Sequence, residues 1–218
     1  MQIQAHILTT IPIFAIEDEM EKVIRFFKTT TFSHVAVMEH NKLLGMLSEN
    51  DFETFEKEKK IEDYRFVLEA FFVREETLWL DVLEVFAKND ANLIPVLDKD
   101  DAVMGYYGLT DIVSVFINTP FFTEPGGILV VSKGVKDYSF SEISQIVESN
   151  NAKLYGALIT DITNDIVEIT LKITTENLNE ITQSFRRYNY SILYGNEDDL
   201  FLEDLKERSK YLDKYLNV

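Results

Sequence analysis

The sequence has no cysteine among its 218 residues. A chain without cysteine has no disulfide framework, no thiol nucleophile and no thiolate ligand for a metal. Proline and glycine are also few, with 4 and 8 residues. Apolar residues nevertheless make up 46% of the chain, which predicts a folded protein of one or two domains with a sizeable core.

Positive charge and long apolar runs are lacking as well. There are 21 Lys and Arg residues against 38 Asp and Glu residues, for a net charge of −17. Such a field repels polyanions, so we expect neither nucleic acid nor an anionic membrane as a partner. No apolar run approaches the roughly 20 residues that cross a bilayer, and residues 1–5 do not begin a secretion signal. We therefore expect a cytoplasmic protein.

Motifs for catalysis or metal binding are missing too. The 3 histidines lack the spacing of a metal site, and Ser-His-Asp and P-loop patterns are not discernible. The acidic residues at 98–101 lack the glycine and distal glutamate of a calcium-binding loop, so they indicate a solvated turn. The sequence predicts a protein that is not an enzyme and has no metal or other resident cofactor.

The sequence does contain a repeat. Residues 45–51 read Gly-Met-Leu-Ser-Glu-Asn-Asp, and residues 105–111 read Gly-Tyr-Tyr-Gly-Leu-Thr-Asp. Upstream of each copy lies an apolar stripe with the i, i+3, i+4, i+7 spacing of an amphipathic helix. Its members are Met20, Val23, Ile24 and Phe27, and 59 positions later Trp79, Val82, Leu83 and Phe86.

Between stripe and glycine, each copy has an apolar run that predicts a buried strand, at 32–38 and at 91–97. Each unit therefore consists of a helix, a buried strand, a turn, a second strand and a helix beginning near the Asp. After Asp51 we expect that helix to include Phe52 and Phe55 and to continue into the charged residues 56–60. A repeated unit of this kind needs its neighbour to bury its apolar face, so the two should pack together.

These features resemble the tandem CBS-domain family, also called the Bateman module. The resemblance is based on the entry at 11–13, the two buried strands and the two endings Gly-x-x-Ser-x-x-Asp and Gly-x-x-Gly-x-x-Asp. It implies an α/β fold with a CBS-domain pair of β-α-β-β-α units. We place CBS unit 1 at residues 1–60 and CBS unit 2 at 61–122.

A different architecture follows the cluster of proline and glycine at 120–127. Strands are predicted at 128–131, 154–161, 167–173 and 190–193, with two helices that begin at the capping boxes Ser139/Glu142 and Asn177/Glu180. This β-α-β-β-α-β order is that of a ferredoxin-like α+β unit. Residues 126–195 resemble the regulatory ACT domain through Leu178, Ile181, Phe185 and 188–190. A CBS pair followed by an ACT-like domain is similar to acetoin-utilisation-type proteins. The tail at 198–218 is predicted to be an amphipathic C-terminal helix.

The resemblance to CBS modules implies two clefts for an adenine nucleotide or another adenosine-type ligand. In such modules strand backbone and apolar residues hold the base, a Ser or Thr contacts phosphate, and the Asp binds the ribose. Carried over to this sequence, the first site is Ile11, Pro12, Val35, Ala36, Ser48 and Asp51. The second is Phe72, Ile94, Pro95 and Asp111.

Simpler roles remain open for the same residues. Asp51 and Asp111 would also serve as caps of the helices that follow them. Glu49 and Asn50 stand where phosphate-binding members often have a basic residue, and Gly108 replaces the hydroxyl in the second ending. Tyr106 and Tyr107 flank the second cleft and would either stack on an adenine or alternate between core and surface. His34 is interpreted as a core histidine.

Together these features predict a non-enzymatic regulatory protein that senses a ligand through its CBS pair, with the ACT-like domain mediating dimerisation or small-molecule sensing. The alternative is a structural or protein-interaction module with degenerate ligand sites. We expect a homodimer, because CBS pairs and ACT domains commonly pair and thereby cover strand edges. A small-molecule nucleotide and a regulated protein are the other partners that this reading implies.

Overall fold

The computed structural model describes residues 3–174 and 177–195. The chain divides into two compact units, Met1–Asn118 and Thr119–Val218. The tail predicted as an amphipathic helix at 198–218 lies outside the described residues. Each unit has its own core, so each is described by itself.

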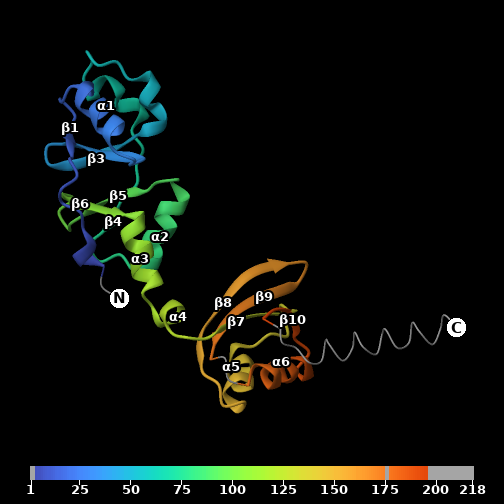
Figure 1. Ribbon diagram of the computed structural model, residues 1–218. Helices are drawn as coiled ribbons and strands as arrows, with labels where there is room; N and C mark the ends of the chain where they lie inside the picture. The colour runs from blue at the N-terminus through green and yellow to red at the C-terminus, as the bar shows by residue number, and fades with distance from the viewer. Residues whose placement is uncertain (1–2, 175–176, 196–218) are drawn as a thin grey trace. The chain divides into compact units, whose positions relative to one another are not determined.

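The first unit contains the two repeats seen in the sequence (Figure 1). After the short 3₁₀ helix η1 (Gln4–His6), the first repeat has a sheet of order β1-β2-β3, with β1 parallel to β2 and β3 antiparallel to it. Its elements are β1 (Phe14–Ala15), α1 (Met20–Thr29), β2 (His34–Glu39), β3 (Lys42–Ser48) and the 3₁₀ helix η2 (Glu49–Thr54).

The second repeat follows the 3₁₀ helix η3 (Ile61–Val67), and its sheet has the matching order β4-β5-β6. Its elements are β4 (Val73–Arg74), α2 (Trp79–Lys88), β5 (Leu93–Leu97), β6 (Val103–Gly108) and α3 (Leu109–Ile117). The predicted stripe of α1 is confirmed, because its four residues are all buried. In α2 the stripe residues Val82 and Phe86 are buried, while Trp79 and Leu83 are partly buried against the same core.

The last helix of the first repeat differs from the prediction. The segment after Ser48 forms only a short 3₁₀ helix that ends at Thr54, and no helix continues through residues 56–60. Phe55 is instead buried against the ring of Tyr64, with centroids 5.2 Å apart, and the Tyr64 hydroxyl accepts a 2.8 Å hydrogen bond from the Glu56 N–H. These contacts turn the chain away from the helical path.

The two repeats are connected by entry segments that cross over. Leu8, ahead of the first repeat, pairs antiparallel with Tyr106 in β6 of the second, through hydrogen bonds of 2.7 and 3.0 Å. Glu69, ahead of the second repeat, pairs in the same way with Met46 in β3 of the first, through bonds of 2.8 and 2.9 Å. Each repeat is therefore completed by backbone that belongs to the other.

The second unit is a four-stranded antiparallel sheet of order β10-β7-β9-β8. Both longer helices, α5 and α6, cover the same face of this sheet, and α4 lies beside β8 (Figure 1). The elements are α4 (Pro120–Thr123), β7 (Gly127–Gly134), α5 (Phe140–Ser149), β8 (Leu154–Thr163), β9 (Ile166–Ile173), α6 (Leu178–Arg187) and β10 (Ser191–Tyr194).

Of the two predicted capping boxes, the first is half formed and the second is not formed. Ser139 Oγ accepts a 3.4 Å hydrogen bond from the Glu142 N–H, but the Glu142 carboxylate pairs with Lys133 at 2.6 Å rather than returning to the cap. Asn177 lies in the left-handed region with φ 58°, and its side chain donates to the Asn150 carbonyl instead of capping α6. The Glu142 and Asn177 side chains therefore make tertiary contacts, which a local sequence pattern does not predict.

Candidate functional site

The first candidate cleft centres on the point where the β1–β2 ladder ends. β1 begins at Phe14, which pairs with Val37, so the Pro12 carbonyl and the Ala36 N–H lie just outside that ladder. Both backbone groups are bound by one atom, the Tyr106 hydroxyl. It donates to the Pro12 oxygen at 2.7 Å and accepts from the Ala36 nitrogen at 3.1 Å.

Tyr106 pairs with Pro95 of the second candidate site, but its hydroxyl contacts Pro12 and Ala36 of the first. Tyr106 and Ala36 are both fully buried. Burial raises the pKa of Tyr106, which keeps the hydroxyl neutral and able to donate and accept at once. The prediction that Tyr106 and Tyr107 alternate between core and surface is wrong, since both side chains are 0% exposed.

The second candidate cleft lacks the same donor and acceptor pair. Position 95, the counterpart of Ala36, is a proline, which has no N–H to offer. The residue that pairs with Pro95 across the hairpin is Tyr106, whereas Ala36 pairs with Met46 in the first repeat. Ile94 is fully buried, and Phe72 is 44% exposed with its ring 5.7 Å from the Arg74 guanidinium.

The two endings differ in how they start the following helix. Ser48 is the N-cap of η2, since its hydroxyl accepts a 3.2 Å hydrogen bond from the Asn50 N–H, and its side chain is buried. Gly108 is the N-cap of α3, and a Cβ added there would lie 2.9 Å from Asp111 Oδ2. Asp51 and Asp111 lie within the first helical turns, so the interpretation of both as caps is wrong.

The glycine of each ending makes room for a crossing entry segment. A Cβ at Gly105 would lie 2.5 Å from the Leu8 carbonyl oxygen, and its φ of +153° favours glycine. A Cβ at Gly45 would lie 2.9 Å from Leu68 Cβ and 3.0 Å from the Glu69 carbonyl oxygen. The repeated glycine is thus required by the exchange of segments between the repeats.

Equivalent residues of the two repeats also bond to each other. Asn92 Oδ1 accepts from the Ser33 N–H at 2.8 Å and from the Ser33 hydroxyl at 3.1 Å. The Asn92 N–H donates to Ser33 Oγ at 2.8 Å, and Asn92 Nδ2 donates to the Thr31 carbonyl at 2.8 Å. Ser33 and Asn92 are 59 positions apart, the period of the repeat, so this cluster lies where the two copies face each other.

His34 lies beside this cluster as a buried side chain. Its Nδ1 is 2.8 Å from Ser33 Oγ, its Nε2 is 3.6 Å from Glu69 Oε1, and its ring packs edge-on against Phe71. Desolvation lowers the pKa of His34, although the carboxylate of Glu69 opposes the shift. His34 is 2% exposed, which confirms its interpretation as a core histidine.

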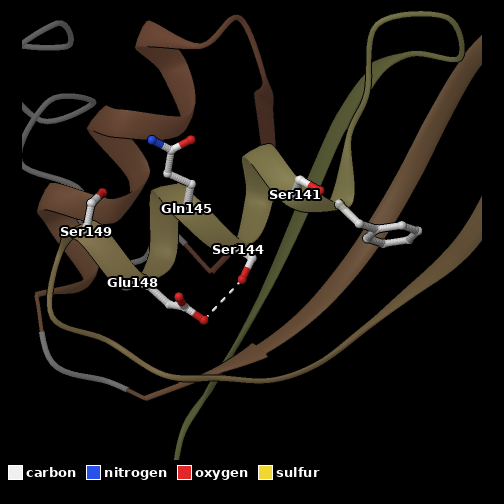
Figure 2. A pocket seen from close by; sticks show the side chains of 6 residues that line it. Ser141, Ser144, Gln145, Glu148 and Ser149 are labelled. Atoms are coloured by element: carbon white, nitrogen blue, oxygen red, sulfur yellow. Dashed lines mark hydrogen bonds between the residues drawn. The ribbon is translucent and has the colours of Figure 1, made fainter.

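The described part of the second unit has hollows at two places. One, of about 600 Å³, is a groove whose described lining residues all belong to α5, and Figure 2 shows its side chains on successive turns of that helix, with Ser144 bonded to Glu148 at 3.1 Å. Ligand pockets draw a few polar groups together from several elements, and this groove does not. The other, of about 210 Å³, lies at the turns after β7 and β8 and is lined by Gly134, Val135, Lys136, Asp137 and Asp165.

The comparison that decides the family is with the CBS-domain model. This model matches the chain twice, at residues 5–55 and 64–118. The first unit is a tandem pair of CBS domains. The fold class is accordingly mixed α/β with a CBS pair, as the repeat predicted.

Solved CBS structures are similar to part of the chain. A CBS domain pair/ACT domain protein from Thermotoga maritima is 16% identical with a TM-score of 0.48, covering 54% of this chain and 97% of that one. The CBS domains of a transcriptional regulator from Streptococcus pneumoniae are 13% identical with a TM-score of 0.46, covering 52% and 98%. CBSX2 in complex with AMP is 14% identical with a TM-score of 0.44, covering 53% and 96%. No curated protein matches the sequence.

The described residues contain neither a metal-binding cluster nor a membrane-spanning helix. In residues 3–174 and 177–195, no three His, Cys, Asp or Glu side chains are grouped so as to hold a metal ion. Within the same residues, no helix combines the length and the apolar character needed to cross a membrane.

Proposed function

We propose that this chain is a non-catalytic regulatory protein in which the CBS pair is the sensing unit. The observation that carries the proposal is the crossing of the entry segments, which makes each repeat part of the other. The first cleft combines Pro12 and Ala36 of the first repeat with Tyr106 of the second. A ligand in this cleft would therefore touch both CBS domains.

Such a ligand would act by differential affinity for two arrangements of the CBS domains. A ligand that binds one arrangement more tightly shifts the population toward it, and a target that contacts only that arrangement then responds. This mechanism requires no bond to be made or broken, in keeping with a regulatory role.

An adenosine-type ligand is the class that we propose for the first cleft, with Ile11, Pro12, Val35 and Ala36 around the base and Ser48 and Asp51 at the sugar end. A carboxylate offers several acceptor sites for ribose hydroxyls. Glu49 and Asp51 at the start of η2 would repel a phosphate at this end. We therefore expect adenosine to bind better than AMP, and AMP better than ATP.

For the second unit we propose a ferredoxin-like, ACT-like domain that pairs two chains or holds a small molecule. Its strands follow the β-α-β-β-α-β order, and its two longer helices, α5 and α6, pack on one face of the sheet, so that among the described residues neither of them covers the other face. Apolar side chains on that face remain exposed, namely Ile128, Leu158 and Tyr194. A homodimer formed by this unit would cover them.

The test of the sensing role is thermal unfolding of the whole protein with adenosine, AMP, ADP, ATP, S-adenosylmethionine and a set of amino acids. A ligand that prefers the folded state must raise the melting temperature. We expect adenosine to raise it in the wild type and in Asp111→Ala, and the increase to disappear in Asp51→Ala. The absence of a shift with every compound would contradict the nucleoside role.

A second candidate is an interaction module with degenerate ligand sites. It is favoured by Pro95, which removes the backbone donor from the second cleft, and by Gly108, which removes the hydroxyl from its ending. Purification of the protein with one stoichiometric protein partner and no retained small molecule would support this candidate over the first.

A further inference from the structure

The Tyr106 hydroxyl binds a donor and an acceptor that strand pairing leaves unused. The Pro12 carbonyl and the Ala36 N–H flank the end of the β1–β2 ladder and converge on a single oxygen, at 2.7 and 3.1 Å. Ala36 is fully buried, and a buried N–H without a partner is costly, so this group needs an acceptor, while the carbonyl of Pro12, an exposed residue, accepts from the same atom. The phenol of the second repeat provides both.

The same pair of groups would suit the edge of a purine. Adenine presents an amino donor next to a ring-nitrogen acceptor, which matches a carbonyl beside an N–H. Tyr106 is fully buried, so its ring already fills the space behind this pair. A base and the tyrosine ring would compete for the same volume and the same two backbone groups.

We propose that Tyr106 is an internal occupant of the base position in the first cleft, so that a base enters only when the phenol leaves. This inference rests on the proposed sensing role, and it adds the way in which that role is regulated. Because Tyr106 comes from the second CBS domain and its partners from the first, its departure also removes a connection between the domains. Binding of a base and loss of this connection between the two CBS domains are thereby linked.

Competition of this kind has a quantitative consequence. The apparent affinity of a ligand falls in proportion to the fraction of molecules whose cleft is open. Removing the Tyr106 ring opens the cleft in every molecule. Adenosine should therefore bind Tyr106→Ala at least about tenfold more tightly than the wild type.

The adjacent residue offers a matched control. Tyr107 lies on the same strand and is equally buried, but its hydroxyl has no hydrogen-bond partner among the described residues. Tyr107→Ala removes the same side-chain volume without vacating the Pro12 and Ala36 groups. Any effect shared by both variants reports the loss of a buried ring alone.

The decisive experiment uses thermal unfolding of wild type, Tyr106→Ala and Tyr107→Ala with phenol, toluene and adenosine as probes. Both small rings fill an apolar hole, but only phenol has a hydroxyl. We expect phenol to raise the melting temperature of Tyr106→Ala more than toluene does, and the two probes to act alike on Tyr107→Ala. Equal effects of phenol and toluene on Tyr106→Ala would overturn the proposal.

The adenosine arm separates this inference from the sensing role. If phenol is selective but adenosine binds neither wild type nor Tyr106→Ala, the adenosine role and the competition for the base position both fail. If adenosine binds the wild type at least as tightly as Tyr106→Ala, the sensing role stands and the competition is disproved.

The variant Tyr106→Phe keeps the ring and covers the case in which Tyr106→Ala does not fold. Hydrogen exchange of the Ala36 amide should accelerate in Tyr106→Phe and remain unchanged in Tyr107→Phe. Unchanged exchange at Ala36 in Tyr106→Phe would show that the hydroxyl does not hold this amide, and the proposal would fail.

Discussion

The two CBS domains share one fold but contribute different residues to their common interface. The first has Ala36 and Met46 at a cross-strand pair, and the second has Pro95 and Tyr106 at the equivalent pair. The first domain thus offers a backbone donor that the second lacks, and the second provides the hydroxyl that binds it. The two domains are therefore complementary at this pair of positions, and equivalent substitutions in them should have unequal effects.

The largest expected difference is between the two repeated glycines. Gly105→Ala should lower the free energy of unfolding by about 3 kcal/mol, because the new Cβ would meet the Leu8 carbonyl at 2.5 Å in a backbone conformation that disfavours alanine. Gly45→Ala should cost about 1.5 kcal/mol, because its nearest contacts, Leu68 Cβ at 2.9 Å and the Glu69 carbonyl oxygen at 3.0 Å, are less close and its φ is not in the region that favours glycine. Denaturant unfolding of both variants measures the difference, and equal losses would show that the two crossings tolerate a side chain alike.

The next difference separates the two neighbouring tyrosines. Tyr106→Phe should cost about 2 kcal/mol, since the Ala36 N–H is left buried without a partner and the Pro12 carbonyl loses its donor. Tyr107→Phe removes a hydroxyl that has no partner in the described part of the chain, and we expect no loss. The two variants are compared by urea unfolding at neutral pH. A loss in Tyr107→Phe as large as that in Tyr106→Phe would mean that the bridge does not stabilise the pair.

A smaller effect is expected at the contact between Ser33 and Asn92. Asn92→Ala should cost about 1.5 kcal/mol, because the Asn92 side chain accepts two hydrogen bonds from Ser33 and donates one to Thr31. Ser33→Ala should cost about 1 kcal/mol, because it removes a single hydroxyl. Urea unfolding of the two variants gives the order, and the reverse order would show that the hydroxyl organises the cluster.

The smallest expected effect depends on pH. Burial lowers the pKa of His34 below its ordinary 6.5, so the unfolded chain takes up a proton before the folded one does. The contribution to stability is therefore present above pH 6.5 and is lost progressively as the pH falls below it. His34→Leu places there the type of residue found at the equivalent position, Leu93, and should flatten this dependence in melting temperatures taken between pH 5 and 8.

The carboxylates that face His34 provide the control for this prediction. Glu69, Asp90 and Asp51 all act to raise the pKa of His34, with Glu69 contributing most among them. Glu69→Gln should therefore lower that pKa further and enlarge the loss of stability in acid. A smaller loss of stability in acid for Glu69→Gln than for the wild type would contradict the assignment of Glu69 as the main carboxylate that raises the pKa of His34.

Much of the fold follows from local sequence patterns. The helical stripe from Met20 to Phe27 and the alternation in β9 each report the environment of a single element, and both are found in the structure. The fate of residues 49–60 was not predictable in this way, because the burial of Phe55 against Tyr64 competes with the helix. The capping boxes at Ser139 and Asn177 are incomplete for a similar reason. Glu142 pairs with the distant Lys133, and Asn177 donates to the distant Asn150 carbonyl.

The candidate site was foreseeable only in outline. Resemblance placed Pro12 and Ala36 at the first cleft, and the structure shows them converging on one point. The contact of the Tyr106 hydroxyl with the first candidate site was not predicted, because a strand pattern does not indicate which neighbour a buried side chain contacts. The one available signal was the pairing of a large polar residue, Tyr106, with a proline at an otherwise apolar repeat position.

Local patterns in the amino-acid sequence predict that two copies of one unit exist, where most of their helices and strands lie, and that the two copies pack together. Those properties depend on residues a few positions apart and on a repeat period of about 60, and both can be read from the sequence. The tertiary structure alone reveals that a tyrosine from the second CBS domain bonds to backbone groups of the first. Tyr106 and Pro12 are 94 positions apart, and their hydrogen bond exists only because the entry segments cross when the two domains pack.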